Sequence, residues 1–272
     1  MTKTRVLITV KTYPTISKKY DELVCTAGLR EDGSWVRIYP IQFRKKPYHE
    51  QYKKYEWIEL DLVKNTSDFR PESYRPYAHD TPIQKVGEIK ADGGSWKERR
   101  KIVLNKVYDD LQLLIQEAKN KEIATSLAVF KPKNIVDFTY ESVEREWSRE
   151  KLEKLNQLNL FEQTQHNNFQ VVKKLPYKFT FHFQDKANKK SKMMIEDWET
   201  GQLYWNSLRR HDGDEVKACL DVRKKYFDDF AKTKDLYFFL GTTQVHHFTA
   251  RNPFVIIGTF HPKKVSQLDL FN

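Results

Sequence analysis

Four aromatic residues alternate with polar ones along LPYKFTFHFQ, residues 175–184. Successive side chains of a strand point to opposite faces, so Tyr177, Phe179, Phe181 and Phe183 share one face. Bases could stack on such rings, as they do in sheet-type single-strand binders. Four exposed rings would be an aggregation hazard, however, so the pattern favours a sheet face packed on its core.

Apolar periodicity divides the rest of the chain into strands and helices. Alternation predicts strands over 5–10, 57–63 and 126–130, a hairpin over 22–43, and two apolar strands over 236–241 and 253–260. Helical spacing predicts helices over 91–122, 140–157 and 214–232. The pattern indicates an α+β fold: a β-rich N-terminal lobe with helices and a smaller mixed α/β C-terminal lobe.

Ser95 is the expected N-cap of the helix over 91–122. Glu98 stands three residues later and would complete a capping box.

The segment 156–172 is rich in Asn and Gln and nearly free of basic residues, so it is predicted to be a linker. It would join an N-terminal domain over 1–155 to a C-terminal domain over 173–265, with a tail over 266–272. No apolar run approaches the length of a membrane span, and no membrane partner is expected. The two cysteines, Cys25 and Cys219, lie far apart and read as buried thiols, which favours a cytoplasmic protein.

The charge of the chain points to a polyanionic partner. Its 48 basic and 37 acidic residues give a net charge of +11, and nucleic acid, DNA above all, is the expected partner. Tyrosines interleave with the first basic group, as a surface that both contacts phosphates and stacks on bases requires. The alternative is a surface whose charge only keeps the protein soluble. The predicted nucleic-acid contacts are Arg44, Lys45, Lys46, Lys53, Lys54, Arg99, Arg100, Lys101, Lys189, Lys190, Arg209 and Arg210.

The sharpest acidic cluster places Glu196, Asp197 and Glu199 within four residues. Nucleases gather carboxylates to hold Mg²⁺ near a scissile phosphate, so these are candidate catalytic residues, with Glu196 and Asp197 as metal ligands. The alternative is a helix start, because acidic side chains are stabilised at the positive end of a helix dipole.

His246 and His247 lie in a loop between two apolar strands and are further catalytic candidates, as a general base or metal ligand. The alternative is an ordinary surface histidine pair.

A second acidic stretch, WIELDLVKNTSDFRPES, loosely resembles the acid-x-Lys arrangement of restriction-type nucleases. A solvated strand face is the competing interpretation. Asp68, Arg70 and Glu72 can instead form a structural ion-pair turn. The chain has no phosphate-binding loop, dinucleotide-binding glycine motif, Gly-x-Ser-x-Gly or Cys-x-x-Cys pair, which excludes the corresponding ATPase, dehydrogenase, esterase and zinc-finger classes.

Gln-Leu-x-Leu-Phe occurs twice, at 157–161 and at 267–271. It resembles the peptide by which many bacterial replication and repair proteins bind the DNA sliding clamp. The resemblance implies that the glutamine binds the rim of a pocket while the apolar side chains enter a groove, and a terminal tail can order on such binding. The C-terminal copy is the expected clamp-binding segment, through Gln267, Leu268, Leu270 and Phe271. A tail that docks on its own domain is the alternative.

Several stretches also resemble a family of uncharacterised prokaryotic proteins. They are LVCTAGLREDGSWVRIYPIQFR, DFRPES, SLAVFKP, LPYKFTFHF, IEDWE and NPFVIIGTF. The resemblance covers both lobes and implies a complete two-part protein, but it supplies no catalytic residues.

The sequence therefore predicts a DNA-associated protein tethered to the sliding clamp and acting in repair, modification or defence. It is a candidate metal-dependent nuclease, with Mg²⁺ as the cofactor in that case. The alternatives are a non-catalytic reader of nucleic acid or of modified bases, and a protein-interaction subunit.

Overall fold

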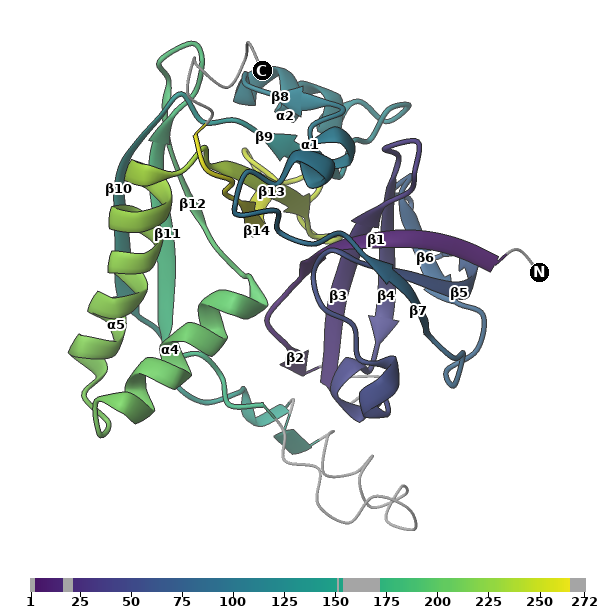
Figure 1. Cartoon of the computed structure of the whole chain (residues 1–272), viewed down its shortest axis with the longest axis horizontal. Coiled ribbons are helices and arrows are strands. Elements are labelled where there is room, and N and C mark those ends of the chain that lie inside the picture. Colours follow the sequence, from purple (N-terminus) through teal and green to yellow (C-terminus); the bar gives the residue numbers. More distant parts are fainter. Residues whose placement is uncertain (1–2, 17–21, 151, 154–171, 265–272) are drawn as a thin grey trace.

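The computed structural model describes residues 3–16, 22–150, 152–153 and 172–264. Strands from the first 90 residues form one sheet at the right of Figure 1. They are β1 (Lys3–Lys11), β2 (Thr15–Ile16), β3 (Glu22–Leu29), β4 (Trp35–Ile41), β5 (Glu56–Lys64), β6 (Ser73–Pro76) and β7 (Gln84–Glu88), with the short 3-10 helices η1 (Phe43–Lys45) and η2 (Tyr48–Glu50) between β4 and β5.

This sheet closes into a barrel. Strand β1 pairs with both β3 and β5, and the ring is completed through β4 and β6. Alternation along β1 puts Val6 and Ile8 in the barrel interior and Leu7 in a different cluster outside it. Val10 also belongs to the outer cluster, because the register of β1 shifts between Ile8 and Val10. The barrel therefore has apolar side chains on two faces and needs a second layer.

The second lobe supplies that layer with two further sheets. One has the order β14-β13-β9-β8 and the other the order β10-β11-β12. The elements are α1 (Lys97–Val103), β8 (Val107–Tyr108), α2 (Leu111–Lys119), β9 (Leu127–Phe130), β10 (Asn134–Ser142), β11 (Tyr177–Gln184), β12 (Lys190–Met194), α4 (Trp198–Arg210), α5 (Glu215–Arg223), the π-helical segment η3 (Lys224–Ala231), β13 (Tyr237–Thr242) and β14 (Phe254–Phe260).

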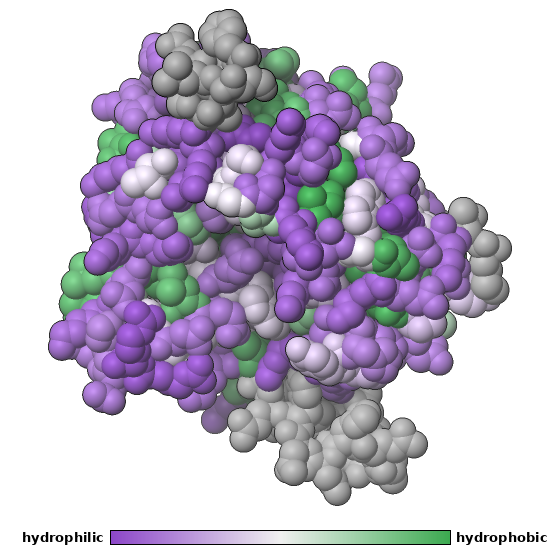
Figure 2. Space-filling model, in the orientation of Figure 1, coloured by the Kyte–Doolittle hydropathy of each residue, from purple (hydrophilic) through white to green (hydrophobic). Residues whose placement is uncertain are grey.

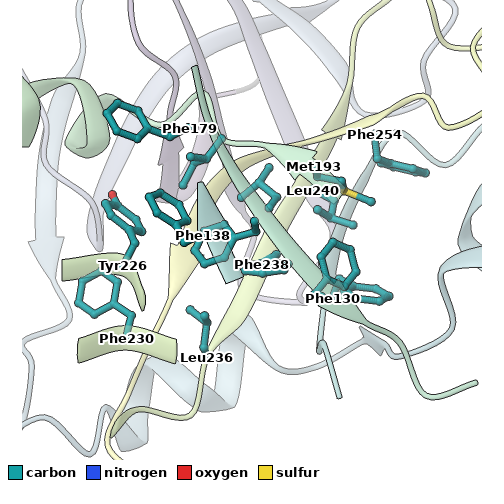
Figure 3. Close-up of a cluster of buried hydrophobic side chains, with 14 of the residues drawn as sticks. Phe130, Phe138, Phe179, Met193, Tyr226, Phe230, Leu236, Phe238, Leu240 and Phe254 are labelled. Carbon is teal, nitrogen blue, oxygen red and sulfur yellow. The ribbon is translucent and has the colours of Figure 1, made fainter. Parts of the chain in front are cut away.

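The alternating rings of β11 lie in the core of this lobe, so the sheet-face prediction is confirmed. Phe179, Phe181 and Phe183 are at most 1 % exposed. The ring of Phe181 lies 4.8 Å from that of Phe238 on β13, which joins the two sheets. Figure 3 shows the surrounding cluster, in which Tyr226 of η3 stacks on Phe138 of β10.

A second apolar cluster joins the barrel to the other lobe. Leu7 and Leu29 on the outer face of the barrel belong to the same buried cluster as Val129, Phe239 and Ile257 from β9, β13 and β14. The two lobes therefore share buried apolar surface, and the observed architecture confirms the α+β prediction.

The predicted helix over 91–122 is wrong as a single element. It is two short helices, α1 and α2, separated by β8, because Val107 and Tyr108 pair in parallel with Val129 and Phe130 of β9. Ser95 is not the N-cap either. The residue before α1 is Trp96, and the Asp92 carboxylate instead accepts the first backbone N–H groups of the helix.

The predicted helix over 140–157 is wrong over residues 140–148, whereas residues 149, 150, 152 and 153 are helical. Residues 140–142 end strand β10, and 143–148 are irregular. The alternating side chains of β10 find a partner in β11, and this pairing overrides the local helical spacing. The helix predicted over 214–232 is observed as α5, which continues into η3.

Strands β9 and β10 fall inside the predicted first domain but pair with β13 and β11, which fall inside the predicted second one. The strands before residue 90 thus form the first sheet, and those after it form the other two. The division of the chain into domains at 155 and 173 stays a prediction. None of the described helices has both the length and the apolar character needed to cross a membrane. Figure 2 shows a face covered mainly by hydrophilic residues, with small separate hydrophobic patches.

Candidate nucleic-acid interface

A cleft of about 1020 Å³ lies where the barrel meets the second lobe. Its walls on the barrel side come from the segment after β1, from β3 and β4, and from the segment after β5. Those on the other side come from residues 143–147, the start of β11, the β12–α4 junction, the end of β13 with the loop after it, and β14. The basic residues of its lining are Arg37, Arg70, Arg75, Lys174 and Lys178, and the acidic ones are Asp68 and Glu196.

Arg37 is a buried cation in the wall of this cleft. It extends from β4 and is only 3 % exposed. Its Nη2 donates to the backbone and side-chain oxygens of Ser126 (3.0 and 3.2 Å), and its Nη1 donates to Cys25 Sγ (3.6 Å). Its Nε has no hydrogen-bond partner, and no carboxylate in the described part of the chain lies within ion-pair distance. Burial lowers the pKa of this guanidinium.

Asp68 and Arg70 form the ion-pair turn that the sequence suggested, whereas Glu72, the third residue of that prediction, accepts from the backbone N–H and hydroxyl of Ser126. Arg70 Nε and Nη2 donate to the Asp68 carboxylate (2.9 and 2.5 Å), and the Ser73 hydroxyl donates to the same group (2.7 Å). Arg70 Nη1 also donates to the carbonyl of Thr242 on β13, so the turn links the two lobes. Burial acts to raise the pKa of Asp68, but the hydrogen bonds from Arg70 and Ser73 outweigh it and lower the pKa.

The cleft carries a net positive charge. Arg70 neutralises Asp68, and burial raises the pKa of Glu196, which disfavours its charged form. Lys178 pairs with Glu141, whereas the side chains of Arg75 and Lys174 donate, within the described part of the chain, only to backbone carbonyls. Tyr13, Tyr39, Trp147 and Tyr177 add aromatic surface to the lining.

The structure separates the three acids of the cluster 196–199. Lys54 Nζ, from the segment before β5, lies 2.9 Å from Asp197 Oδ1 and 2.9 Å from Glu199 Oε2. Glu196 instead faces the cleft on the other side of the Asp197 backbone. The ion pair joins the barrel to the second lobe, next to an isolated backbone β-bridge between Thr12 and Asp197.

Burial and charge oppose each other in this ion pair. The Asp197 side chain is 0 % exposed and that of Lys54 is 6 % exposed. Burial acts to lower the pKa of Lys54, but Asp197 and Glu199 outweigh it and raise the pKa. Burial raises the pKa of Asp197, against the opposing effect of Lys54.

These residues do not fit the predicted Mg²⁺ site. The Lys54 ammonium occupies the space between Asp197 and Glu199 where a cation would bind, and Glu196 points elsewhere. In the described ranges, no three His, Cys, Asp or Glu residues group so as to hold a metal ion. Asp197 is the N-cap residue of α4, as the helix-start alternative holds.

The two candidate histidines have different environments. His246 is exposed. His247 is fully buried: its Nε2 donates to the carbonyl of Ala118 (2.7 Å), and its Nδ1 accepts from the Thr242 hydroxyl (2.7 Å). Burial lowers the pKa of His247. With both ring nitrogens engaged, His247 holds α2 to β13 and is not available as a base.

The predicted basic contacts do not form one surface. Lys53, Lys54 and Arg99 converge on a second cavity, of about 510 Å³, described below. The others lie on separate elements: Arg44 and Lys45 on η1 with Lys46 after it, Arg100 and Lys101 on α1, Lys189 and Lys190 before and at the start of β12, and Arg209 and Arg210 at the end of α4. Five of them are held by acids, in the pairs Arg44–Glu22, Lys46–Glu50, Arg100–Asp235, Lys101–Glu98 and Arg210–Asp221.

Sequence reasoning missed Arg37, Arg75, Lys174 and Lys178 as members of one site. The available signal was the single arginine in the apolar strand WVRIYPI, since arginine is rarely buried without a partner. The clamp-like segments at 157–161 and 267–271, with Gln267, Leu268, Leu270 and Phe271, lie outside the described residues.

Comparison with known proteins gives two family matches. Residues 92–272 match a family described as "Domain of unknown function (DUF8757)", and residues 2–105 match one described as "Domain of unknown function (DUF8758)". No curated protein matches the chain. One similar solved structure is described as "Structure of murine DNA binding protein bound with ds DNA", with 10 % identity, 98 % of each chain covered and a TM-score of 0.33. A score that low does not establish a shared fold.

Proposed function

The chain belongs to the family described as a domain of unknown function (DUF8757), and we propose from the geometry of its cleft that it is a DNA-binding protein that takes one nucleotide into this cleft. The observation that carries the proposal is Arg37, a buried cation with an unused donor and no carboxylate partner among the described residues, in the wall of a positively charged cavity.

The outer cations suit a phosphate backbone. Arg75 is exposed and Lys174 is half-buried, and neither has a carboxylate partner in the described ranges. Cations in this state can neutralise phosphates without first breaking an internal ion pair. Such contacts hold a nucleic acid in place but carry no sequence information.

The interior suits a single nucleotide. The volume of about 1020 Å³ is at the upper end of the range for small-molecule sites. Four aromatic residues line the cleft beside hydroxyl and amide groups such as those of Asn65, Thr242 and Gln244. An extruded base is recognised by stacking and by hydrogen bonds to its edge. Arg37 supplies donors of the kind that bind the acceptor atoms of a base.

This geometry favours the reader hypothesis over the nuclease hypothesis. Lys54 holds two of the three candidate acids, and the third faces a different cavity. A metal-dependent nuclease would need carboxylates that converge on a cation. Roles in repair, modification or defence stay predictions from the sequence.

The double substitution Arg75→Ala/Lys174→Ala is expected to weaken DNA binding and to make it less dependent on salt. Each lost phosphate contact reduces the slope of log affinity against log salt by about 1. The measurement is fluorescence anisotropy with labelled single- and double-stranded DNA at several salt concentrations. The control is Lys225→Ala/Lys232→Ala, which removes the same charge from η3 and the residue after it.

Equal losses in the two variants would show that binding follows net charge and not the cleft. Absent or salt-insensitive binding by the native protein would support the protein-interaction alternative. Arg37→Met then tests the interior: the fluorescence rise of a 2-aminopurine base on extrusion should be lost, while phosphate-driven affinity changes little. An unchanged 2-aminopurine signal in Arg37→Met would contradict the proposed role of the buried arginine.

The C-terminal segment gives a separate prediction, which rests on the sequence alone. Leu270→Ala/Phe271→Ala is expected to abolish binding to a bacterial sliding clamp, because the two apolar anchors would be lost together. Surface plasmon resonance with immobilised clamp measures this, and DNA binding serves as the internal control. If the inner copy at 157–161 is the true anchor, the substitution Leu160→Ala/Phe161→Ala will abolish binding instead.

A further inference from the structure

We propose that the second cavity, of about 510 Å³, binds a nucleoside phosphate, at a site separate from the DNA cleft. This cavity, termed the Lys11 cavity, is lined by Lys11, Lys53, Tyr55, Trp96, Arg99 and Trp198, among others. It lies across the β12–α4 junction from the cleft, since Glu196 faces the cleft whereas Trp198 and Glu199 face the Lys11 cavity. Figure 1 shows the left-hand end of β1 near the start of α4, where an isolated backbone β-bridge joins Thr12 to Asp197. Lining residues of the cavity come from both of these elements.

Two buried cations in the Lys11 cavity have no ion-pair partner among the described residues. Lys11 is 9 % exposed and Arg99 is 7 % exposed, and no carboxylate of the described residues lies within 4 Å of either. Lys54, which lines the same cavity, has two carboxylate partners. Buried charges in proteins are normally paired, so two unpaired cations in one cavity indicate a site for an anion.

Each of the two cations is held in place by other means. Lys11 Nζ donates to the carbonyl of Tyr52 (3.0 Å) and lies 4.4 Å from the ring centre of Phe43. The Arg99 guanidinium lies 3.9 Å over the ring of Tyr55, and its Nε donates to the carbonyl of Ile89. Both cations therefore keep unused donors.

Tyr55 lines the same cavity, and its buried hydroxyl is a third unsatisfied group. Tyr55 is 6 % exposed, and its Oη has no hydrogen-bond partner among the residues that the structure describes. Its backbone lies in the left-handed region, with a φ of 67°, which is uncommon for a residue other than glycine. A buried hydroxyl without a partner costs free energy, and an anionic oxygen would satisfy it.

The remaining lining suits a flat ring. Trp96 and Trp198 come from segments far apart in the chain and line the same cavity, and the exposed side chains of Glu199 and Gln202 lie at its edge. Stacking on tryptophan and hydrogen bonding at an edge are the contacts that a nucleobase makes. A phosphate monoester attached to a base therefore matches both halves of the lining. The source is either a free mononucleotide or the phosphorylated end of a strand.

The protonation of Lys11 should make ligand binding at this site depend on pH. Burial lowers its pKa to about 8, and the charge of Lys54 adds to this, against the opposing charges of Glu199, Asp197 and Glu56. Lys53 and Arg99 are the other cations of the lining, and burial keeps His261 neutral by lowering its pKa to about 3. A phosphate monoester is fully charged above about pH 7 and does not change its charge at higher pH. A change in affinity between about pH 7 and about pH 9 would therefore report the deprotonation of Lys11.

The experiment is calorimetric titration of the full-length protein with nucleoside monophosphates, the parent nucleosides and inorganic phosphate. Monophosphates should bind more tightly than either fragment, with a roughly tenfold loss of affinity from about pH 7 to about pH 9. Lys11→Arg should bind without that pH dependence. Tyr55→Phe, which removes only the unpartnered hydroxyl, should fold normally and bind about tenfold more weakly.

Two further arms identify the source of the ligand and separate this site from the cleft. An oligonucleotide with a 5′-phosphate, compared with one that ends in a 5′-hydroxyl, tests for a strand end. Duplex DNA without terminal phosphates should not displace a bound mononucleotide. The proposal is overturned if neither mononucleotides nor phosphorylated ends bind, or if Lys11→Arg and Tyr55→Phe leave the affinity and its pH dependence unchanged.

Discussion

Replacement of Lys54 by methionine is expected to destabilise the protein by about 3–5 kcal/mol, the range for breaking a buried ion pair on one side. Lys54 Nζ contacts both oxygens of Asp197, whose side chain is 0 % exposed, so the substitution leaves a buried carboxylate without its counter-ion. The measurement is the free energy of unfolding from urea denaturation near neutral pH.

Three comparisons sharpen this prediction. Lys101→Met, which removes an exposed ion pair with Glu98, should change the stability by less than about 0.5 kcal/mol. Lys54→Met/Asp197→Asn should recover much of the loss, because no unpaired charge remains. The deficit of Lys54→Met should also shrink as the pH falls, since the raised pKa of Asp197 makes its protonation easier in the folded protein. A loss below about 1 kcal/mol would show that Asp197 has another partner.

Asp68→Asn is expected to destabilise the protein by about 3–5 kcal/mol as well, because it leaves Arg70 buried without its counter-ion. The side chains of Asp68 and Arg70 are only 4 % and 7 % exposed. Asp80→Asn, at an exposed position, is the matched control and should be close to neutral. Urea denaturation of the two variants and the native protein measures the difference.

The effect of Asp68 should depend on pH. Its pKa is lowered in the folded protein, so its contribution to stability is fully present above the unfolded value of about 4. The contribution is lost as the pH falls through the lower folded value. The difference between the native protein and Asp68→Asn should therefore narrow in acid. A constant difference down to about pH 3 would show that the loss comes from packing and not from charge.

The Lys54–Asp197 and Asp68–Arg70 ion pairs both help to join the two lobes. Lys54 of the barrel contacts Asp197 of the second lobe, and Arg70 of the barrel contacts the carbonyl of Thr242 on β13. Both lie where the cavities form, so they fix the distance between the walls of each. The proposed sites thus depend on buried charges that also join the lobes.

Parts of this structure follow from local sequence. The alternating rings of β11 can be buried only in a sheet, and the Asp68–Arg70 turn joins residues two positions apart. Local reasoning gave the wrong result at 91–122, where Val107 and Tyr108 leave the helical pattern to pair with β9. A pairing over about twenty residues leaves no mark on the local periodicity, so the interruption could not be predicted.

By itself the sequence determined the α+β class, the buried face of β11 and the excess of positive charge, because periodicity and composition are properties of neighbouring residues. Only the tertiary structure decided where that charge acts. The fold places Lys54, which is 143 positions from Asp197 and 145 from Glu199, between these two carboxylates, so they do not form the predicted metal site. It also gathered Arg37, Arg75 and Lys174 around one cleft. The physical reason is that an ion pair or a cavity depends on distances in space, which the folded backbone sets and which the spacing along the chain does not contain.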